Sequence, residues 1–309
     1  MPPGHDHPRL PARFAGDPRA SGLPLATRPE RPVLFVNPRS GGGAAGRARL
    51  ADRARELGIE AIELAAGQRL DQLVAAAIDD GADVVGAAGG DGSLATVAAV
   101  ACARDVPFVC VPAGTRNHFA RDLGVDPRDP VGALHALTAG IERRVDVGEV
   151  NGRIFLNNVS LGVYGEAVRA AGYRDAKLRT LLQTAEAVLG PGGEADGLRV
   201  VDDLGVEHRG PALLLASNNP YAPSRPGTRG VRRALDGARL GIVVVDSPAP
   251  RTPPRARAWT ARALVVDGER DIAHAGLDGE PVDLRTPLRI AIRAAALRVR
   301  IRAEITQRA

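Results

Sequence analysis

The sequence feature that most constrains the fold is a glycine-rich turn, Gly89-Gly90-Asp91-Gly92, which is followed by Ser93. Residues 82–88 predict a short buried strand before it, and residues 94–100 predict a helix that begins directly after it. Glycines at such a turn let backbone N–H groups approach a phosphate, and the positive end of the helix dipole adds to this attraction. The Asp91 carboxylate is placed to reach Mg²⁺ or a reacting hydroxyl. Taken alone, the motif is also compatible with a plain tight turn.

A second glycine-rich loop follows the apolar run Val33–Val36. It reads Asn37-Pro38-Arg39-Ser40-Gly41, and a helix is expected over residues 44–57. The loop therefore lies at the carboxyl end of a strand, where open α/β sheets bind ligands. A P-loop is excluded, because the stretch lacks the lysine and has Ala48 where the magnesium-binding hydroxyl belongs.

Two later segments carry polar groups at turns. After the strand expected near residues 108–111, the chain reads Gly114-Thr115-Arg116-Asn117. Thr115 and Asn117 either cap the next helix or contact a ligand. Near the end of the chain, Asp278-Gly279-Glu280 is either a hairpin turn or a pair of working carboxylates. These alternatives stay open from the residues alone.

The spacing of apolar runs predicts two domains. From residue 32 to about 144, strands alternate with helices, which is typical of a doubly wound parallel sheet in an α/β domain. The strands are expected near residues 33–36, 59–64, 83–87 and 108–111, and the helices near 44–57, 70–79, 94–103 and 130–139. Residues 1–30 are rich in Pro, Arg and Gly and predict a disordered tail.

Beyond residue 145 the apolar runs become shorter and are separated by turns, which predicts an antiparallel β-sandwich domain. Its strands are expected near residues 153–159, 197–202, 211–217, 239–245, 262–266 and 271–276, with final strands at 288–292 and 297–301. A helix near residues 174–189 interrupts the series, and loops are expected over 220–226 and 248–254. The domain boundaries are placed at 31–147 for the nucleotide-binding domain and 148–294 for the β-rich substrate domain.

Composition limits the classes of partner. The net charge is +5, which favours anionic surfaces, but no basic run is interleaved with aromatic residues. We therefore expect no nucleic-acid partner. The apolar runs are too short to cross a bilayer and no signal peptide is evident, so we expect a cytoplasmic protein with at most peripheral membrane contact. The oligomeric state is open, and a homodimer is one of the states considered.

Taken in order, these segments resemble the diacylglycerol kinase catalytic-domain family, which includes sphingosine kinases and bacterial soluble lipid kinases. The matching pieces are residues 37–41, 89–93, 112–121 and 278–280, with weaker matches at 145–148 and 235–237. The resemblance extends from about residue 32 to about 301. It implies a two-domain lipid kinase of phospholipid metabolism that uses ATP and Mg²⁺, with diacylglycerol or a related lipid alcohol as the acceptor. It also implies that a terminal strand, about residues 295–303, rejoins the first domain.

The resemblance assigns roles to individual positions. The nucleotide would be held by Asn37, Ser40, Gly41, Gly89, Gly90, Asp91, Gly92, Ser93, Gly114, Thr115 and Asn117. Glu280 matches the proton acceptor, and Asp278 and Asp91 complete the catalytic set. Asp91 and Asp146 would belong to a magnesium–water network, and Asp236 to a second, structural metal site.

Four positions depart from the family pattern, and one of them is Leu64, where the family has a hydroxyl residue near the end of the second strand. Ala95 and Thr96 stand where the family usually has Asn-Glu, and His118 replaces an aspartate that normally joins the magnesium–water network. These changes favour, as one alternative, a non-catalytic relative that binds nucleotide or lipid. A second alternative is a small-molecule kinase such as NAD kinase or phosphofructokinase, which share the Gly-Gly-Asp-Gly turn. The late Asp-Gly-Glu and the Asn-Pro-x-Ser-Gly loop argue against that alternative.

Overall fold

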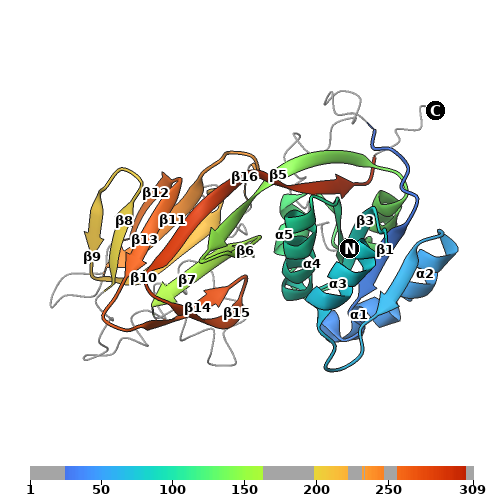
Figure 1. Cartoon of the computed structure of the whole chain (residues 1–309), viewed down its shortest axis with the longest axis horizontal. Coiled ribbons are helices and arrows are strands. Elements are labelled where there is room, and N and C mark those ends of the chain that lie inside the picture. The colour runs from blue at the N-terminus through green and yellow to red at the C-terminus, as the bar shows by residue number, and fades with distance from the viewer. Residues whose placement is uncertain (1–24, 163–197, 222–231, 233, 247–255, 304–309) are drawn as a thin grey trace, which may run out of the picture. The chain divides into compact units, whose positions relative to one another are not determined.

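The computed structural model describes residues 25–162, 198–221, 232, 234–246 and 256–303 (Figure 1). The helix expected near 174–189, the loop at 248–254 and the first 24 residues of the expected tail lie outside the described residues. The chain divides into two compact units. The first takes its described residues from Met1–Gly90, Val106–Arg143 and Val299–Ala309, and the second from Asp91–Asp105 and Arg144–Arg298.

A parallel sheet forms the centre of the first unit. Its strands are β1 (Pro32–Val36), β2 (Glu60–Glu63), β3 (Val84–Gly89) and β4 (Phe108–Pro112), in the order β2-β1-β3-β4. Val299 and Arg300, near the end of β16 (Leu288–Ile301), add a further parallel pairing to β4. The strand order reverses between β1 and β3, which makes their carboxyl ends the switch point of the sheet.

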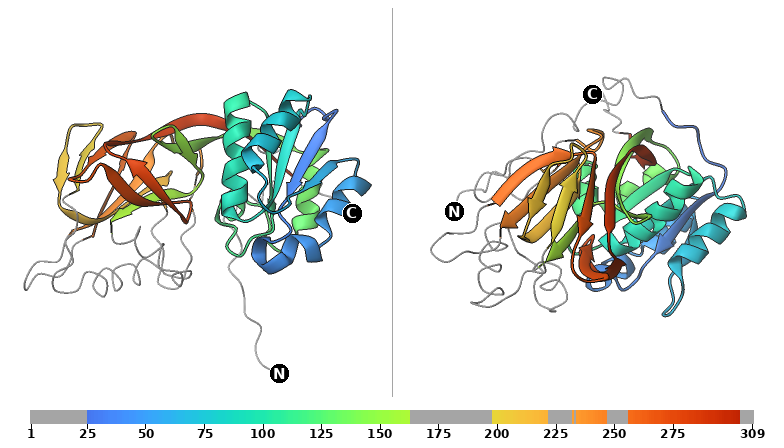
Figure 2. Two further views of the ribbon diagram at one scale, coloured as in Figure 1. Left: turned by 60° about the horizontal axis from the view of Figure 1, so that its bottom comes forward. Right: turned by 60° about the vertical axis from the view of Figure 1, so that its left-hand side comes forward.

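Helices cover this sheet (Figure 2). They are α1 (Ser40–Arg47), α2 (Leu50–Glu56), α3 (Leu70–Asp79), α5 (His118–Asp122), α6 (Pro130–Ala133) and the 3₁₀ turn η1 (Leu134–Leu137). Every residue of β1, β3 and β4 is buried, as expected for strands that are covered on both faces. On one face, Leu34 and Val36 pack with Leu50 of α2 and Leu137 of η1. The predicted α/β domain is therefore confirmed.

Two helices predicted in the first unit differ from those observed. The helix expected over 44–57 is two helices, because Arg49 adopts a left-handed conformation with φ 49° and separates α1 from α2. The helix expected over 130–139 is one α-helical turn, α6, followed by η1. Among the described residues, no helix combines the length and apolar character required to cross a bilayer.

The second unit is built mainly from antiparallel strands. One six-stranded sheet has the order β12-β11-β10-β7-β14-β15. Its members are β7 (Asn158–Gly162), β10 (Pro211–Asn218), β11 (Leu240–Asp246), β12 (Ala256–Ala261), β14 (Ile272–Leu277) and β15 (Glu280–Arg285). The remaining strands are β5 (Ile141–Val150), β6 (Arg153–Phe155), β8 (Arg199–Asp202), β9 (Glu207–Arg209), β13 (Ala263–Asp267) and β16.

The core of the second unit draws on both groups of strands. Val159 and Leu214 of the six-stranded sheet share one apolar cluster with Val200, Leu264 and Ile290 of β8, β13 and β16. This packing of two inner faces is the sandwich that the sequence predicted. The strand expected over 153–159 is two strands, β6 and β7, separated at residues 156–157. The two final strands expected are one strand, β16, although Ala295 within it has a φ of 50°.

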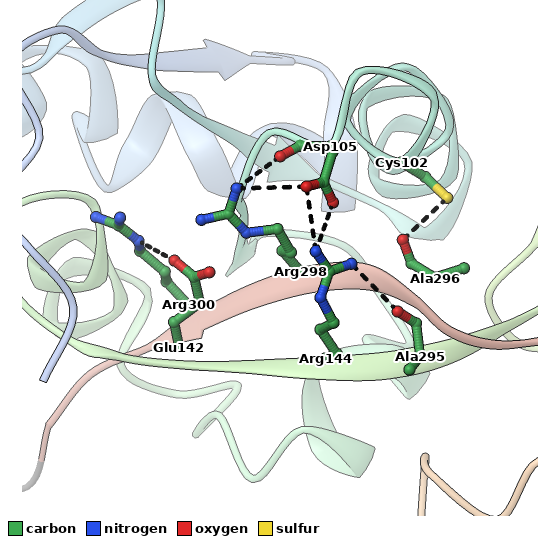
Figure 3. Close-up of polar contacts among 8 residues, drawn as sticks. All are labelled: Cys102, Asp105, Glu142, Arg144, Ala295, Ala296, Arg298 and Arg300. Atoms are coloured by element: carbon green, nitrogen blue, oxygen red, sulfur yellow. Dashed lines mark hydrogen bonds and ion pairs between the residues drawn. The ribbon is translucent and has the colours of Figure 1, made fainter. Parts of the chain in front are cut away.

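Helix α4 (Asp91–Arg104) groups with the second unit although it follows β3 directly in the sequence. Its far end is anchored there by polar contacts (Figure 3). The Arg144 guanidinium donates to both carboxylate oxygens of Asp105, at 2.9 and 3.1 Å. Arg298 donates to the Asp105 carbonyl at 2.7 Å, and the Cys102 thiol donates to the Ala296 carbonyl at 3.4 Å.

Candidate functional site

The loops that follow β1 and β3 are joined by hydrogen bonds at the switch point of the parallel sheet. The Gly90 N–H donates to Ser40 Oγ at 3.2 Å, and the Asn37 N–H donates to the Ala88 carbonyl at 2.9 Å. Asn37 Oδ1 accepts from the Arg39 N–H at 3.1 Å, which closes the start of the loop. The structure thus brings the two predicted nucleotide loops together where α/β sheets commonly bind ligands.

Three successive glycines shape the loop after β1. Gly41, Gly42 and Gly43 have φ values of 58°, 65° and 89°, in the left-handed region that strains other residues. A Cβ on Gly42 would meet nothing within 4 Å, so the backbone conformation alone calls for glycine there. The run leaves backbone amides without flanking side chains, which is the arrangement that a phosphate site needs.

The loop after β4 packs against the Gly89–Gly90 turn. A Cβ on Gly114 would lie 2.5 Å from the Gly90 Cα and 3.3 Å from the Gly89 carbonyl oxygen, so the two backbones touch. Asn117 is buried and bridges its own loop: its Oδ1 accepts from the Gly114 N–H and its Nδ2 donates to the Gly114 carbonyl, both at 2.9 Å. Asn117 therefore does not cap α5 with its side chain, contrary to one of the alternatives. Thr115 is exposed on the same loop.

In the second unit, Asp278 and Gly279 form the two-residue turn between β14 and β15. Their φ values of 51° and 88° are both positive, as the favoured two-residue hairpin turn requires. The Asp278 carboxylate accepts from the backbone N–H groups of Leu156, Asn157 and Asn158 at 2.8, 2.6 and 3.1 Å. Burial raises the pKa of Asp278 to about 6; the nearby Asp91 charge adds to this rise, and the three N–H donors oppose it.

Glu280 follows this turn and lies beside the start of α4. Its Cγ and Oε1 are 3.6 and 3.7 Å from the position that a Cβ on Gly92 would occupy. The Glu280 side chain is exposed, so its carboxylate is accessible. The hairpin turn expected from the sequence is therefore present, and the role of Asp278 and Glu280 as working carboxylates stays a prediction.

Asp91 is the first residue of α4, and one of its carboxylate oxygens is unsatisfied. Oδ1 is buried and has no hydrogen-bond partner within the described part of the chain. Such an oxygen fits a bound cation or a water molecule of its hydration shell. No group of three or more His, Cys, Asp or Glu side chains is placed to hold a metal among the described residues. A single carboxylate, that of Asp91, is still compatible with Mg²⁺, because this ion typically uses one or two carboxylates together with phosphate oxygens and water.

Asp146 is almost fully buried and both of its carboxylate oxygens have protein partners. Oδ2 accepts from Asn219 Nδ2 at 3.0 Å and from the Ala238 N–H at 2.7 Å, and Oδ1 accepts from the Ala295 N–H at 2.8 Å. These bonds tie β5 to three distant segments of the second unit. Asp236 is exposed on the chain next to Ala238. The predicted metal roles of Asp146 and Asp236 stay predictions.

Comparison with known proteins gives a family match over less than half of the chain. Residues 31–150 match the family model for the diacylglycerol kinase catalytic domain. The resemblance inferred from the motifs is confirmed.

Curated relatives match over the same part of the chain. The sequence is 34% identical over 122 residues to a diacylglycerol kinase of Mycobacterium tuberculosis, a match that covers 38% of this chain and 40% of that protein. It is 35% identical over 102 residues to a diacylglycerol kinase of Bacillus subtilis, which covers 32% of this chain and 33% of that protein. The matches thus span well under half the length of these relatives.

A solved structure supports the fold over most of the chain. The crystal structure of a diacylglycerol kinase from Bacillus anthracis str. Sterne superposes with a TM-score of 0.64 and 18% identity, covering 91% of this chain and all of that one. Two further structures from the same organism give TM-scores of 0.68 and 0.66.

Three of the positions that depart from the diacylglycerol kinase pattern lie near the starts of helices. Thr96 Oγ1 donates to the Gly92 carbonyl one turn earlier in α4, at 3.0 Å. Ala95 is half-buried beside it, and His118 is the exposed first residue of α5. Ser93 is half-buried in the first turn of α4.

Sequence reasoning missed the polar cluster that supports the Asp278 turn. Asn157, Asn218 and Arg232 are buried there and hydrogen-bonded to one another's backbone or side-chain atoms. Two Asn-Asn pairs, at 157–158 and 218–219, were a usable signal, because adjacent amides in apolar strands need buried partners. Arg232 gave no comparable signal.

Proposed function

We propose that this protein is a lipid kinase that transfers the γ-phosphoryl group of ATP to the hydroxyl of diacylglycerol or a related lipid alcohol. The observation that carries the proposal is the convergence of three loops, after β1, β3 and β4, at the switch point of a sheet in a domain of the diacylglycerol kinase family. A parallel sheet that collects glycine loops at one point is suited to binding phosphates.

The nucleotide would be bound by the first unit. Asn37, Ser40 and Gly41 would contribute from the loop after β1, Gly89 and Gly90 from the turn after β3, and Gly114, Thr115 and Asn117 from the loop after β4. No lysine lies in these loops, so Arg39 and Arg116 are the nearest cationic side chains in the sequence. Arginine suits this role because its planar fork binds phosphate oxygens in pairs.

Asp91 would hold Mg²⁺ or one of its water ligands through its unsatisfied Oδ1. The metal, when bound, would neutralise charge on the phosphoryl group. Gly92 and Ser93 would present the amides of the first turn of α4 to the same phosphate. Asp146 and Asp236 are further metal candidates by family resemblance alone.

Glu280 would act on the lipid. The lipid hydroxyl oxygen forms a bond to the γ-phosphorus while the bond to the bridging oxygen of ADP breaks, and the hydroxyl proton passes to Glu280. A carboxylate is a weak base toward an alcohol, so the larger contribution of Glu280 is to orient the hydroxyl. Asp278 holds the turn that presents Glu280. The enzyme would be cytoplasmic, and it would bind its lipid acceptor through peripheral contact with a membrane surface.

The test is ADP release from Mg²⁺–ATP against a panel of lipid alcohols in mixed micelles, with Asp91→Asn as the control. Lipid-dependent turnover that the variant loses supports the proposal and identifies the acceptor class. ATP binding without turnover on any lipid refutes it in favour of the non-catalytic relative, for which His118→Asp is the first reversion to make. Turnover with NAD or fructose 6-phosphate in place of lipid refutes it in favour of a small-molecule kinase.

A further inference from the structure

Arg232 is the largest fully buried side chain among the described residues, with 1% of its surface exposed. Removing a guanidinium from water is costly, so its hydrogen bonds must compensate. Nη1 donates to the carbonyls of Leu156 and Asn218 at 2.6 and 2.7 Å, and Nη2 donates to Asn157 Oδ1 at 3.0 Å. The planar fork of arginine thus spans two strand ends that lie 62 residues apart in sequence.

The segment 156–158 connects β6 to β7 and is held from two sides. On one side, Arg232 binds the Leu156 carbonyl and the Asn157 side chain, and the Asn218 N–H donates to the Asn157 carbonyl at 2.9 Å. On the other side, all three N–H groups of the segment point to the Asp278 carboxylate. The Asp278 N–H returns a bond to the Asn158 carbonyl at 2.9 Å.

We infer that Arg232 is a positioning residue for the reaction: it fixes segment 156–158, whose amides fix the Asp278–Gly279 turn and thereby place Glu280. The inference rests on the proposed function for the role of Glu280. Asp278 has both carboxylate oxygens engaged by this segment, so any displacement of its amides moves the turn. Glu280 follows two residues later and opens β15.

A lysine at position 232 would keep the charge but not the geometry. Its single ammonium group cannot span the Leu156 carbonyl, the Asn218 carbonyl and the Asn157 amide as the guanidinium does. Arg232→Lys is therefore the informative variant. Arg300→Lys is the matched control, because Arg300 is also buried but lies in the first unit, where it donates to Glu142 at 3.0 Å (Figure 3). It also donates to the Thr27 carbonyl at 3.1 Å.

The first readout is hydrogen exchange of the backbone amides of residues 156–158 in the full-length protein. We expect exchange at least about tenfold faster in Arg232→Lys than in wild type, and unchanged in Arg300→Lys. Unchanged protection in Arg232→Lys would overturn the inference. This readout needs no turnover, so it decides the positioning role even if the wild-type protein phosphorylates no lipid and the proposed function fails.

The second readout is kinetic. We expect Arg232→Lys to lower kcat with diacylglycerol by about 100-fold, while binding of a fluorescent ATP analogue changes by less than about twofold. In an Asp278→Asn background the same substitution should lower kcat by less than about threefold, because the two residues act on one segment. If Arg232→Lys lowers kcat by the same factor in wild type and in the Asp278→Asn background, the two residues act independently and the inference is wrong.

A variant that fails to fold would not end the test. Asn157→Ala removes only the acceptor of Nη2 and leaves both carbonyl bonds of Arg232 in place. We expect it to raise amide exchange at 156–158 and to lower kcat less than Arg232→Lys does. Wild-type exchange and kcat in Asn157→Ala would contradict the inference.

Discussion

At the residue scale, Gly114 is a position with little room for change. Its missing Cβ leaves space for the Gly90 Cα, which would otherwise lie 2.5 Å away, and a backbone atom cannot move aside as a side chain can. The close approach of these two loops is what brings the predicted nucleotide residues together. Glycine is therefore needed here for contact between backbones, whereas Gly42 is needed for its positive φ.

Gly114→Ala should weaken ATP binding at least about tenfold, because separating the loops displaces the amides that would face the phosphates. The measurement is a titration with a fluorescent ATP analogue, with folding checked by thermal unfolding. Gly46→Ala is the matched control, since a Cβ there meets only the Pro38 carbonyl oxygen at 3.8 Å. Equal ATP affinity in Gly114→Ala and Gly46→Ala would contradict this account of the loops.

The raised pKa of Asp278 leads us to expect that the stability of the protein depends on pH. The pKa is raised from 3.8 to about 6 in the folded protein, chiefly by burial. The unfolded chain therefore loses its proton at lower pH than the folded one, and ionisation of Asp278 removes stability as pH rises from about 4 to about 6. The difference between the two pKa values corresponds to roughly 3 kcal/mol at most.

The measurement is urea unfolding of wild type and Asp278→Asn between pH 4 and pH 8. The stability of wild type relative to the variant should fall as pH rises to about 6 and then stay level, because asparagine does not titrate. If the free energy of unfolding of wild type rises relative to that of Asp278→Asn over the same pH interval, the three N–H donors outweigh burial.

At the element scale, α4 is fastened to the second unit at both ends. Gly92 lies beside Glu280 at its start, and Asp105 meets Arg144 and Arg298 just after its end. Arg298 also binds the Asp105 carbonyl, where a cation is favoured by the helix dipole. This explains why the helix groups with the second unit although the sequence continues it from β3.

Asp105→Asn should lower the stability of the protein by no more than about 1 kcal/mol, because the paired side chains are 29–59% exposed. Asp105→Ala should cost about 1 kcal/mol more, since the φ of 50° at this position is tolerated by asparagine and not by alanine. Urea unfolding of the two variants checks this order. Identical losses would show that the backbone conformation contributes nothing measurable.

Strands β1, β3 and β4 were predictable because each is a short apolar run that ends at a glycine or a polar loop. The break between β6 and β7 was not, because the apolar residues Ile154–Leu156 run directly up to it and its cause is long-range. There the chain turns to meet Asp278, more than 100 residues away. The edge strand β12 was missed because its alternation, Ala-Arg-Ala-Trp-Thr-Ala, carries little apolar content.

The candidate site was predictable where its residues act through local backbone shape. Gly90, Gly114 and the Asp278–Gly279 turn are each marked by glycine in a short motif, and the structure places them as those motifs suggest. Arg232 was not predictable, because its partner Leu156 is 76 residues distant and nothing in its neighbourhood marks it as buried.

At the scale of the whole molecule, most of the residues proposed to bind the nucleotide and those proposed to act in transfer belong to different units. The loops after β1, β3 and β4 belong to the first unit, whereas Asp91, Asp278 and Glu280 belong to the second. Nucleotide affinity and turnover should therefore respond to different substitutions. We therefore expect phosphoryl transfer to a lipid to be lost through substitutions that leave nucleotide affinity unchanged.

The most direct test is transfer of radiolabelled γ-phosphate from Mg²⁺–ATP into extracted lipid by wild type and Glu280→Gln. We expect labelled lipid with wild type, a loss of two or more orders of magnitude in kcat for Glu280→Gln, and ATP affinity within about twofold of wild type. Near-normal transfer by Glu280→Gln, or no labelled lipid from wild type with any lipid alcohol, would contradict this expectation.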